Sequence, residues 1–106
     1  MAARTKLFDP VDYLTSDEAL AEYVSAALET GDPAFIADSL GIVARAKGMA
    51  KVARQARLGR ESLRKALSAD GHPEFATVLK VMQALGLRLT ASVGHSGAGR
   101  RRKGAA

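Results

Sequence analysis

The sequence predicts an all-α domain of five helices followed by a short C-terminal β-strand. Apolar residues recur three and four positions apart in five separate segments. Glycines, an Asp-Pro step and a polar loop divide these segments. Only after residue 86 does the spacing change to every second residue, which is typical of a strand. The 106 residues provide one core, built mainly from aliphatic side chains because 5% of the chain is aromatic.

Two longer helices are expected first. Thr15 with Glu18 forms a capping box for a helix that begins after Leu14 and ends at Gly31. Its apolar stripe consists of Leu20, Tyr23, Val24, Ala27 and Leu28. Asp32-Pro33 starts the next helix, which Gly48 ends. Its stripe consists of Ile36, Leu40, Val43 and Ala44. Gly41 argues against an unbroken helix there, because an internal glycine costs roughly 0.5–1 kcal/mol relative to alanine.

Three shorter helices and a strand complete the expected fold. The helices are marked by three apolar sets: Met49, Val52, Ala53 and Ala56; Leu63, Ala66 and Leu67; Phe75, Val78, Leu79, Met82 and Leu85. The strand covers Leu87–Val93. The chain is therefore divided into an extended segment (1–13), a folded domain (14–93) and a tail (94–106). The tail is rich in Gly and basic residues and is expected to be disordered.

Composition excludes several classes of protein. Cysteine is absent, and His72 and His95 are too far apart in sequence to suggest a metal site, so neither a metal nor a cofactor is expected. No apolar run approaches the ~18 residues of a membrane span, and no apolar signal core is seen, so the protein is expected to be cytoplasmic without membrane contact. No clustered acid–base pair or phosphate loop is recognisable. The sequence therefore argues against an enzyme.

Charge is distributed unevenly along the chain. Residues 1–40 contain two basic and eight acidic residues, whereas residues 41–106 contain fourteen basic and three acidic residues. A basic half joined to an acidic half suggests a surface for a polyanion beside a region that avoids one. The alternative is that these charges only solvate the surface.

The most informative stretch is the unit 49–67, MAKVARQARLGRESLRKAL. Two short helices can cross closely only if the residues between them are small, and Ala53 and Ala56 lie on the inner face of the first helix. The second helix then carries Arg60, Glu61, Ser62, Arg64 and Lys65 away from the core. A short helix that projects polar residues is what the DNA major groove admits.

This unit resembles the helix-turn-helix of the phage-repressor (Cro/CI, or XRE) family, and the chain from about Phe8 to Val93 is similar to HigA-like addiction-module antitoxins. The pieces that carry the resemblance are GDP (31–33), VARAKG (43–48), RESL (60–63) and HPEFATVL (72–79). The resemblance implies a lambda-repressor-like fold and an antitoxin. Such a protein represses its own operon by binding double-stranded operator DNA, and neutralises a cognate toxin of the RelE/ParE kind.

The resemblance also implies DNA-contacting positions. They are Lys51, Gln55, Arg60, Glu61, Ser62, Arg64, Lys65 and Thr77. Among them we expect Arg60 and Arg64 to read base edges, and Lys51, Lys65 and Thr77 to contact phosphates. Glu61 is either a contact to cytosine or an ordinary helix partner of Lys65.

The turn departs from the family pattern at two positions. Arg57 replaces a common glycine, and Gly59 replaces the Ser or Thr that usually caps the recognition helix. Either Arg57 adopts a left-handed conformation, which is uncommon for such a residue, or Gly59 absorbs the turn two residues later. The start of the recognition helix depends on which of the two occurs.

A lone strand needs a partner, because its N–H and C=O groups are otherwise unpaired. We expect Leu87, Leu89 and Val93 to pair with their copies in a homodimer, which would place two recognition helices about one DNA turn apart. The alternative is an extended segment packed on its own domain.

Two other functions remain open at this stage. One is a transcriptional regulator without a toxin partner. The other is an interaction module that masks a basic partner through its acidic N-terminal half.

Overall fold

A computed structural model of the chain describes residues 16–94, and within this range the fold consists of five helices. They are α3 (Asp17–Glu29), α4 (Pro33–Lys47), α5 (Met49–Ala56), α6 (Arg60–Ala66) and α7 (Phe75–Ala84). The expected segment 1–13, most of the expected tail and the predicted cap Thr15 lie outside the described residues.

The first two helices form an antiparallel pair with local caps. Ser16 caps α3, since its Oγ accepts a hydrogen bond from the N–H of Ala19 at 3.0 Å. The cap is therefore one residue later than the predicted cap, Thr15. Asp32 caps α4 as predicted, because its Oδ1 accepts from the N–H of Ala34 at 3.1 Å. Asp17 of α3 and Lys47 of α4 form an ion pair at 3.7 Å at the other end of the pair.

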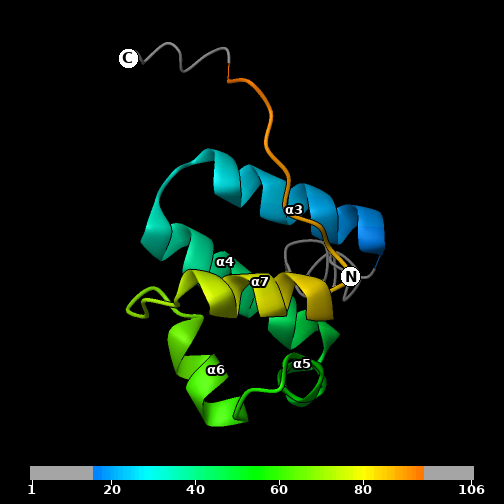
Figure 1. The fold of residues 1–106 in the computed structure, drawn as a ribbon, viewed down its shortest axis with the longest axis vertical. Coiled ribbons are helices and arrows are strands. Elements are labelled where there is room, and N and C mark those ends of the chain that lie inside the picture. The colour runs from blue at the N-terminus through cyan, green and yellow to red at the C-terminus, as the bar shows by residue number, and fades with distance from the viewer. Residues whose placement is uncertain (1–15, 95–106) are drawn as a thin grey trace, which may run out of the picture.

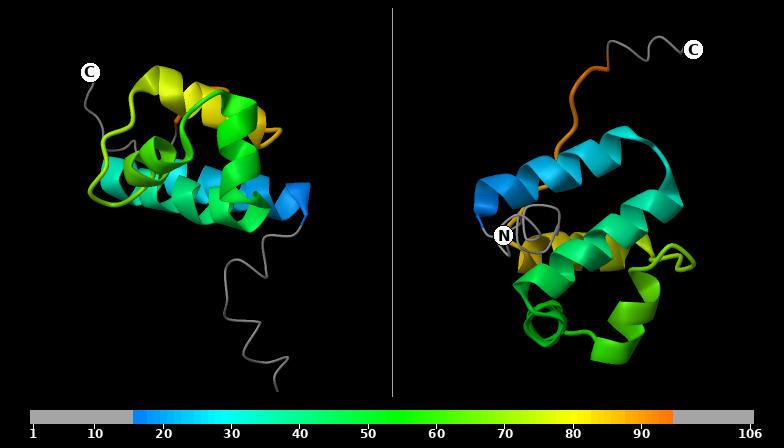
Figure 2. Two further views of the ribbon diagram at one scale, coloured as in Figure 1. Left: turned by 90° about the horizontal axis from the view of Figure 1, so that it is seen from below. Right: turned by 180° about the vertical axis from the view of Figure 1, so that it is seen from behind.

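Helix α5 is the centre of the second half of the domain and packs against α4, α6 and α7. Figure 1 shows α3 on one side of the domain and α5 and α6 on the other, with α4 and α7 across the middle. The views in Figure 2 confirm that α5 and α6 cross at a steep angle. The five helices share one core of buried residues, consisting of Leu20, Val24, Leu40, Val43, Ala44, Val52, Ala53, Leu63, Leu67, Val81, Met82 and Leu85.

Helix α4 is unbroken, contrary to the doubt that Gly41 raised. Gly41 is buried, and a Cβ at this position would lie less than 3.0 Å from the carbonyl oxygen of Leu67. The glycine is needed because the end of α6 approaches the backbone of α4 closely.

Two sequence expectations fail in the C-terminal part of the described chain. Phe75 was expected on the buried stripe of α7, but it begins the helix and is 67% exposed, while Val81 is fully buried instead. The expected strand at Leu87–Val93 is not formed within residues 16–94, because no second strand is present there to pair with it.

The segment after α7 packs on its own domain. Gly86 has a φ of +79°, and the N–H of Leu87 donates to the carbonyl oxygen of Met82 at 2.8 Å. This is a Schellman motif, which turns the residue after the glycine back towards the helix. Leu87 and Leu89 are accordingly half-buried against the core, and residues 87–90 line a small cavity together with α3. Residues 87 and 89 of the described chain therefore pack on their own domain, while residues 90–94 are exposed.

Candidate nucleic-acid interface

The turn between α5 and α6 is made by Arg57, which adopts the left-handed conformation with φ 61° and ψ 44°. The N–H of Arg57 donates to the carbonyl oxygen of Arg54 at 3.1 Å, and the N–H of Leu58 donates to that of Ala53 at 2.9 Å. These two bonds form a second Schellman motif, with Leu58 packed against the core. Gly59 has a φ of −68°, so of the two alternatives the structure shows Arg57 making the turn.

The recognition helix expected from the sequence is α6, and Gly59 precedes it as a cap without any side-chain hydrogen bond. Helix α6 is fixed to the domain from its inner face. Leu63 is 1% exposed, and so is Leu67 directly after the helix. On α5, Val52, Ala53 and Ala56 are buried, and their small size lets α6 cross closely.

Seven of the eight predicted DNA-contacting residues are exposed. They are Lys51, Gln55, Arg60, Glu61, Ser62, Arg64 and Lys65. Thr77 is half-buried on α7. It lines a hollow between α6 and α7 together with Ser62, so residues far apart in sequence come together at this place. Gln55 does not line this hollow. It lines a second hollow, between the C-terminal ends of α5 and α7.

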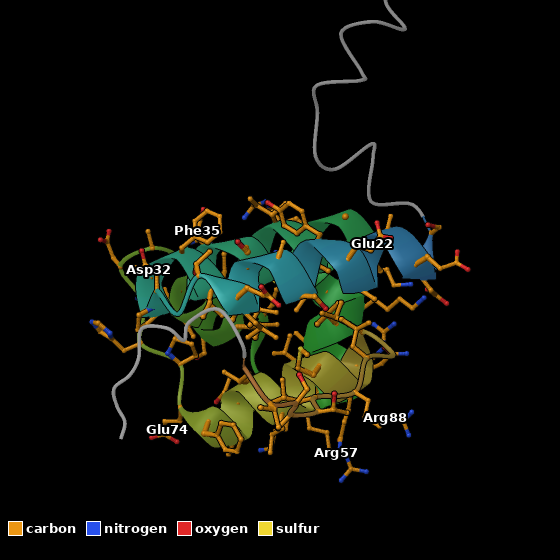
Figure 3. All side chains as sticks on the ribbon, turned by 90° about the horizontal axis from the view of Figure 1, so that it is seen from above. Glu22, Asp32, Phe35, Arg57, Glu74 and Arg88 are labelled. Carbon is orange, nitrogen blue, oxygen red and sulfur yellow. The ribbon has the colours of Figure 1, made fainter. Side chains whose placement is uncertain are left out.

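Besides Gln55, this second hollow is lined by basic and amide side chains that the sequence analysis did not select as DNA contacts. Arg57 and Lys80 line it with Gln55 and Gln83. Figure 3 shows Arg57 projecting from the domain on the side away from α3, which carries Glu22. The left-handed turn is the signal that could have drawn attention to Arg57, because it presents this side chain at the corner of the unit.

An ion pair lies on the exposed face of α6. The carboxylate of Glu61 accepts a hydrogen bond from the guanidinium of Arg64, one helical turn further on. The hydrogen bond and charge of Arg64 lower the pKa of Glu61, and Glu61 in turn raises the pKa of Arg64. Both groups are ionised at neutral pH. The partner of Glu61 in this structure is therefore Arg64 rather than Lys65.

Helix α3 has the opposite electrostatic character. Residues 16–32 contain no basic residue, and their acidic residues Asp17, Glu18, Glu22, Glu29 and Asp32 are all exposed. The domain thus presents an acidic helix and, from Arg45 to Lys65, a mainly basic surface.

None of the helices within residues 16–94 is long and apolar enough to cross a membrane. In this same range no group of three or more His, Asp or Glu side chains is arranged to hold a metal ion.

Comparison with known proteins relates most of this chain to one family. Residues 4–93 match the family described as "Probable addiction module antidote protein". An uncharacterised protein of Haemophilus influenzae is 44% identical over 88 residues, which make up 83% of this chain and 91% of that relative. No solved structure matches the chain.

Proposed function

Because the chain belongs to the addiction module antidote family, we propose that this antitoxin binds operator DNA through α5 and α6 and represses its own toxin–antitoxin operon. The family implies a toxin partner. We further propose that this toxin is of the RelE/ParE kind, and that the antitoxin neutralises it by direct binding in the cytoplasm. This function requires no catalytic group and no cofactor.

The observation that carries the proposal is the division of α6 into a buried and an exposed face. Leu63 is 1% exposed, whereas Arg60, Ser62 and Arg64 are exposed and are covered by no element of residues 16–94. In a lambda-repressor-like helix-turn-helix, residues near the start of the second helix reach base edges in the major groove. Helix α6 carries exposed polar residues from its first turn, namely Arg60, Glu61 and Ser62.

We assign base contacts to Arg60 and Arg64, because a guanidinium can donate two hydrogen bonds to guanine O6 and N7. Lys51 and Lys65 are assigned to phosphates, which reward cations through counterion release. Thr77 lines one hollow with Ser62 between α6 and α7, and we assign to its hydroxyl a hydrogen bond to a phosphate beside α6.

Binding to duplex DNA from the promoter of its own operon tests the DNA-binding proposal. The wild-type protein should bind this duplex with an affinity that falls steeply as salt rises. Replacing Arg60 and Arg64 by alanine should abolish the preference for this duplex over a scrambled one. Glu22→Gln on α3 is the control and should retain the preference. Salt-independent binding, or none, would contradict the proposal.

The acidic helix α3 is the surface we propose for the toxin. A protein that binds RNA or DNA presents positive charge, and the exposed acidic residues of α3 complement such a surface. Co-purification of the product of the adjacent reading frame with the antitoxin tests this, using the intact chain and the variant Glu18→Lys/Glu22→Lys. The intact chain should form the complex, and the variant should associate more slowly at low salt. Absence of a complex with the intact chain would refute the toxin partner.

A homodimer is proposed through the segment after α7. Leu87 and Leu89 are half-buried in their own domain, but Val93 is 79% exposed, and residues 90–94 are all exposed. Pairing of two such segments would supply the missing strand and relate two α6 helices by a two-fold axis. Sedimentation analysis should show a dimer for the wild type and a monomer for Val93→Asp. A monomeric wild type would rule out this arrangement.

A further inference from the structure

Glu61 is an unusual residue for a surface that is proposed to face DNA. From residue 39 to residue 69 it is the one acidic residue, and eight basic residues lie in the same range. It occupies the exposed face of α6, between Arg60 and Arg64. A phosphate that approaches this face therefore meets a negative charge within a group of cations.

The geometry ties Glu61 to its strongest neighbour. Its carboxylate accepts a hydrogen bond from the guanidinium of Arg64, and the two side chains are 65% and 59% exposed. Lys65 and Arg60 also stabilise the ionised carboxylate, as the lowered pKa of Glu61 reflects. The carboxylate thus neutralises part of the positive charge of α6, and in the protein without DNA Arg64 is already paired with Glu61.

Arg64 can contact DNA either at a phosphate or at the edge of a guanine base, and Glu61 affects these two contacts differently. A phosphate attracts any cation, but on α6 its attraction is reduced by the repulsion from Glu61 and by the bond that Arg64 already makes. A guanine edge offers two acceptors without a full negative charge, so Arg64 can bind it with less repulsion from the carboxylate. Glu61 therefore weakens contacts to phosphate more than contacts to bases.

We infer that Glu61 is a specificity-determining residue of the DNA interface, which lowers the affinity for non-operator DNA by opposing phosphate contacts of α6. This inference rests on the proposed DNA-binding function. A merely local role, in which the Glu61–Arg64 pair only stabilises α6, predicts a change in folding stability and no change in the ratio of the two DNA affinities.

The test begins with wild-type protein and a pool of random duplexes, from which repeated binding selects an enriched sequence. Affinities are then measured for the enriched duplex and for a scrambled duplex of the same composition. In Glu61→Gln the scrambled duplex should bind about eightfold more tightly at 0.1 M salt, with a salt slope steeper by about 0.9, as expected for one additional neutralised phosphate. Affinity for the enriched duplex should change less than twofold, so discrimination falls several-fold.

Two further variants separate this effect from others. Glu61→Asp retains the carboxylate and should bind the scrambled duplex no more than twofold more tightly than the wild type. Glu22→Gln makes the same change in net charge on α3 and should leave both affinities unchanged. Circular dichroism checks that each variant is folded.

The outcomes distinguish the inference from the function on which it rests. If the wild type enriches a sequence but Glu61→Gln has wild-type discrimination, the inference is wrong and the DNA-binding function stands. An equal effect of Glu22→Gln would also overturn it, since net charge alone would then explain the change. If the wild type enriches no sequence, both are refuted.

Discussion

The carbonyl oxygen of Leu67 lies directly against the backbone of Gly41, so that the end of α6 is held on the middle of α4. Leu63 and Leu67 bury the inner face of α6 at the same time. The position of α6 relative to the core is therefore fixed by a contact that only glycine permits.

Gly41→Ala tests this contact. A helix interior normally gains from replacing glycine by alanine, but the added Cβ would force α6 away from α4. We expect a loss of about 1–3 kcal/mol in the free energy of unfolding, which is the usual range for overpacking. Urea denaturation measures it. Gly59→Ala is the control, because a Cβ there would meet no atom closer than 3.7 Å. A stabilised Gly41→Ala variant would contradict the close approach.

Arg57 should limit the stability of the turn, since a left-handed conformation strains any residue with a Cβ. Two variants test this, Arg57→Gly and Arg57→Ala. Both lack the long side chain of Arg57, but only the glycine variant also lacks the Cβ. We expect the glycine variant to be more stable than the alanine variant by about 1 kcal/mol in urea denaturation. Equal stability of the two variants would argue against a left-handed Arg57.

The crossing of α5 and α6 depends on small residues, and Ala53→Leu should disrupt it. Ala53 is 3% exposed, so leucine has no room there. We expect a loss of about 1–3 kcal/mol of stability. Ala50 on the same helix is exposed, and Ala50→Leu should change stability by less than about 0.5 kcal/mol. Thermal unfolding of the pair measures the difference, and equal effects would refute the close crossing.

Lys51 and Arg60 should affect DNA binding in different ways. Lys51→Ala should weaken binding to all duplexes alike and reduce the salt slope by about 0.9, because one phosphate contact is lost. Arg60→Ala should relax the preference at one base position, at a cost of about 1–3 kcal/mol for the preferred base. Titrations over a range of salt concentrations, with a set of single-base variants of the bound duplex, separate the two. A change of base preference in Lys51→Ala would reverse the assignment.

Local sequence signals predicted the helices well because they describe interactions within a few residues. Asp32 caps α4 through its own side chain, and its partner N–H groups are two and three residues away. The stripe of Leu20, Val24 and Ala27 is buried as its spacing predicts. The seven exposed candidates of α5 and α6 also follow from helical period alone, once the inner face is recognised.

Contacts between distant segments could not be predicted in this way. Gly41 looked like a weak point in α4, yet its lack of a side chain admits the backbone of Leu67, which lies twenty-six residues further along the chain. Phe75 fits the apolar period of α7, but it lies at the first position of the helix, beyond the reach of the core. Helical periodicity predicts on which face of its helix a residue lies, but it does not predict how far the neighbouring helices extend to cover that face.

The amino-acid sequence by itself determined the five helices, the small residues at the α5–α6 crossing and the separation of acidic from basic residues, because caps, periodicity and charge are properties of nearby residues. Tertiary structure decided that Arg57 makes the turn, that Glu61 pairs with Arg64, and that Leu87 folds back on its own core. The turn at Arg57 and the position of Leu87 depend on how the helices pack, whereas the exposed pair of Glu61 and Arg64 depends on which of two neighbouring cations on α6 the carboxylate meets.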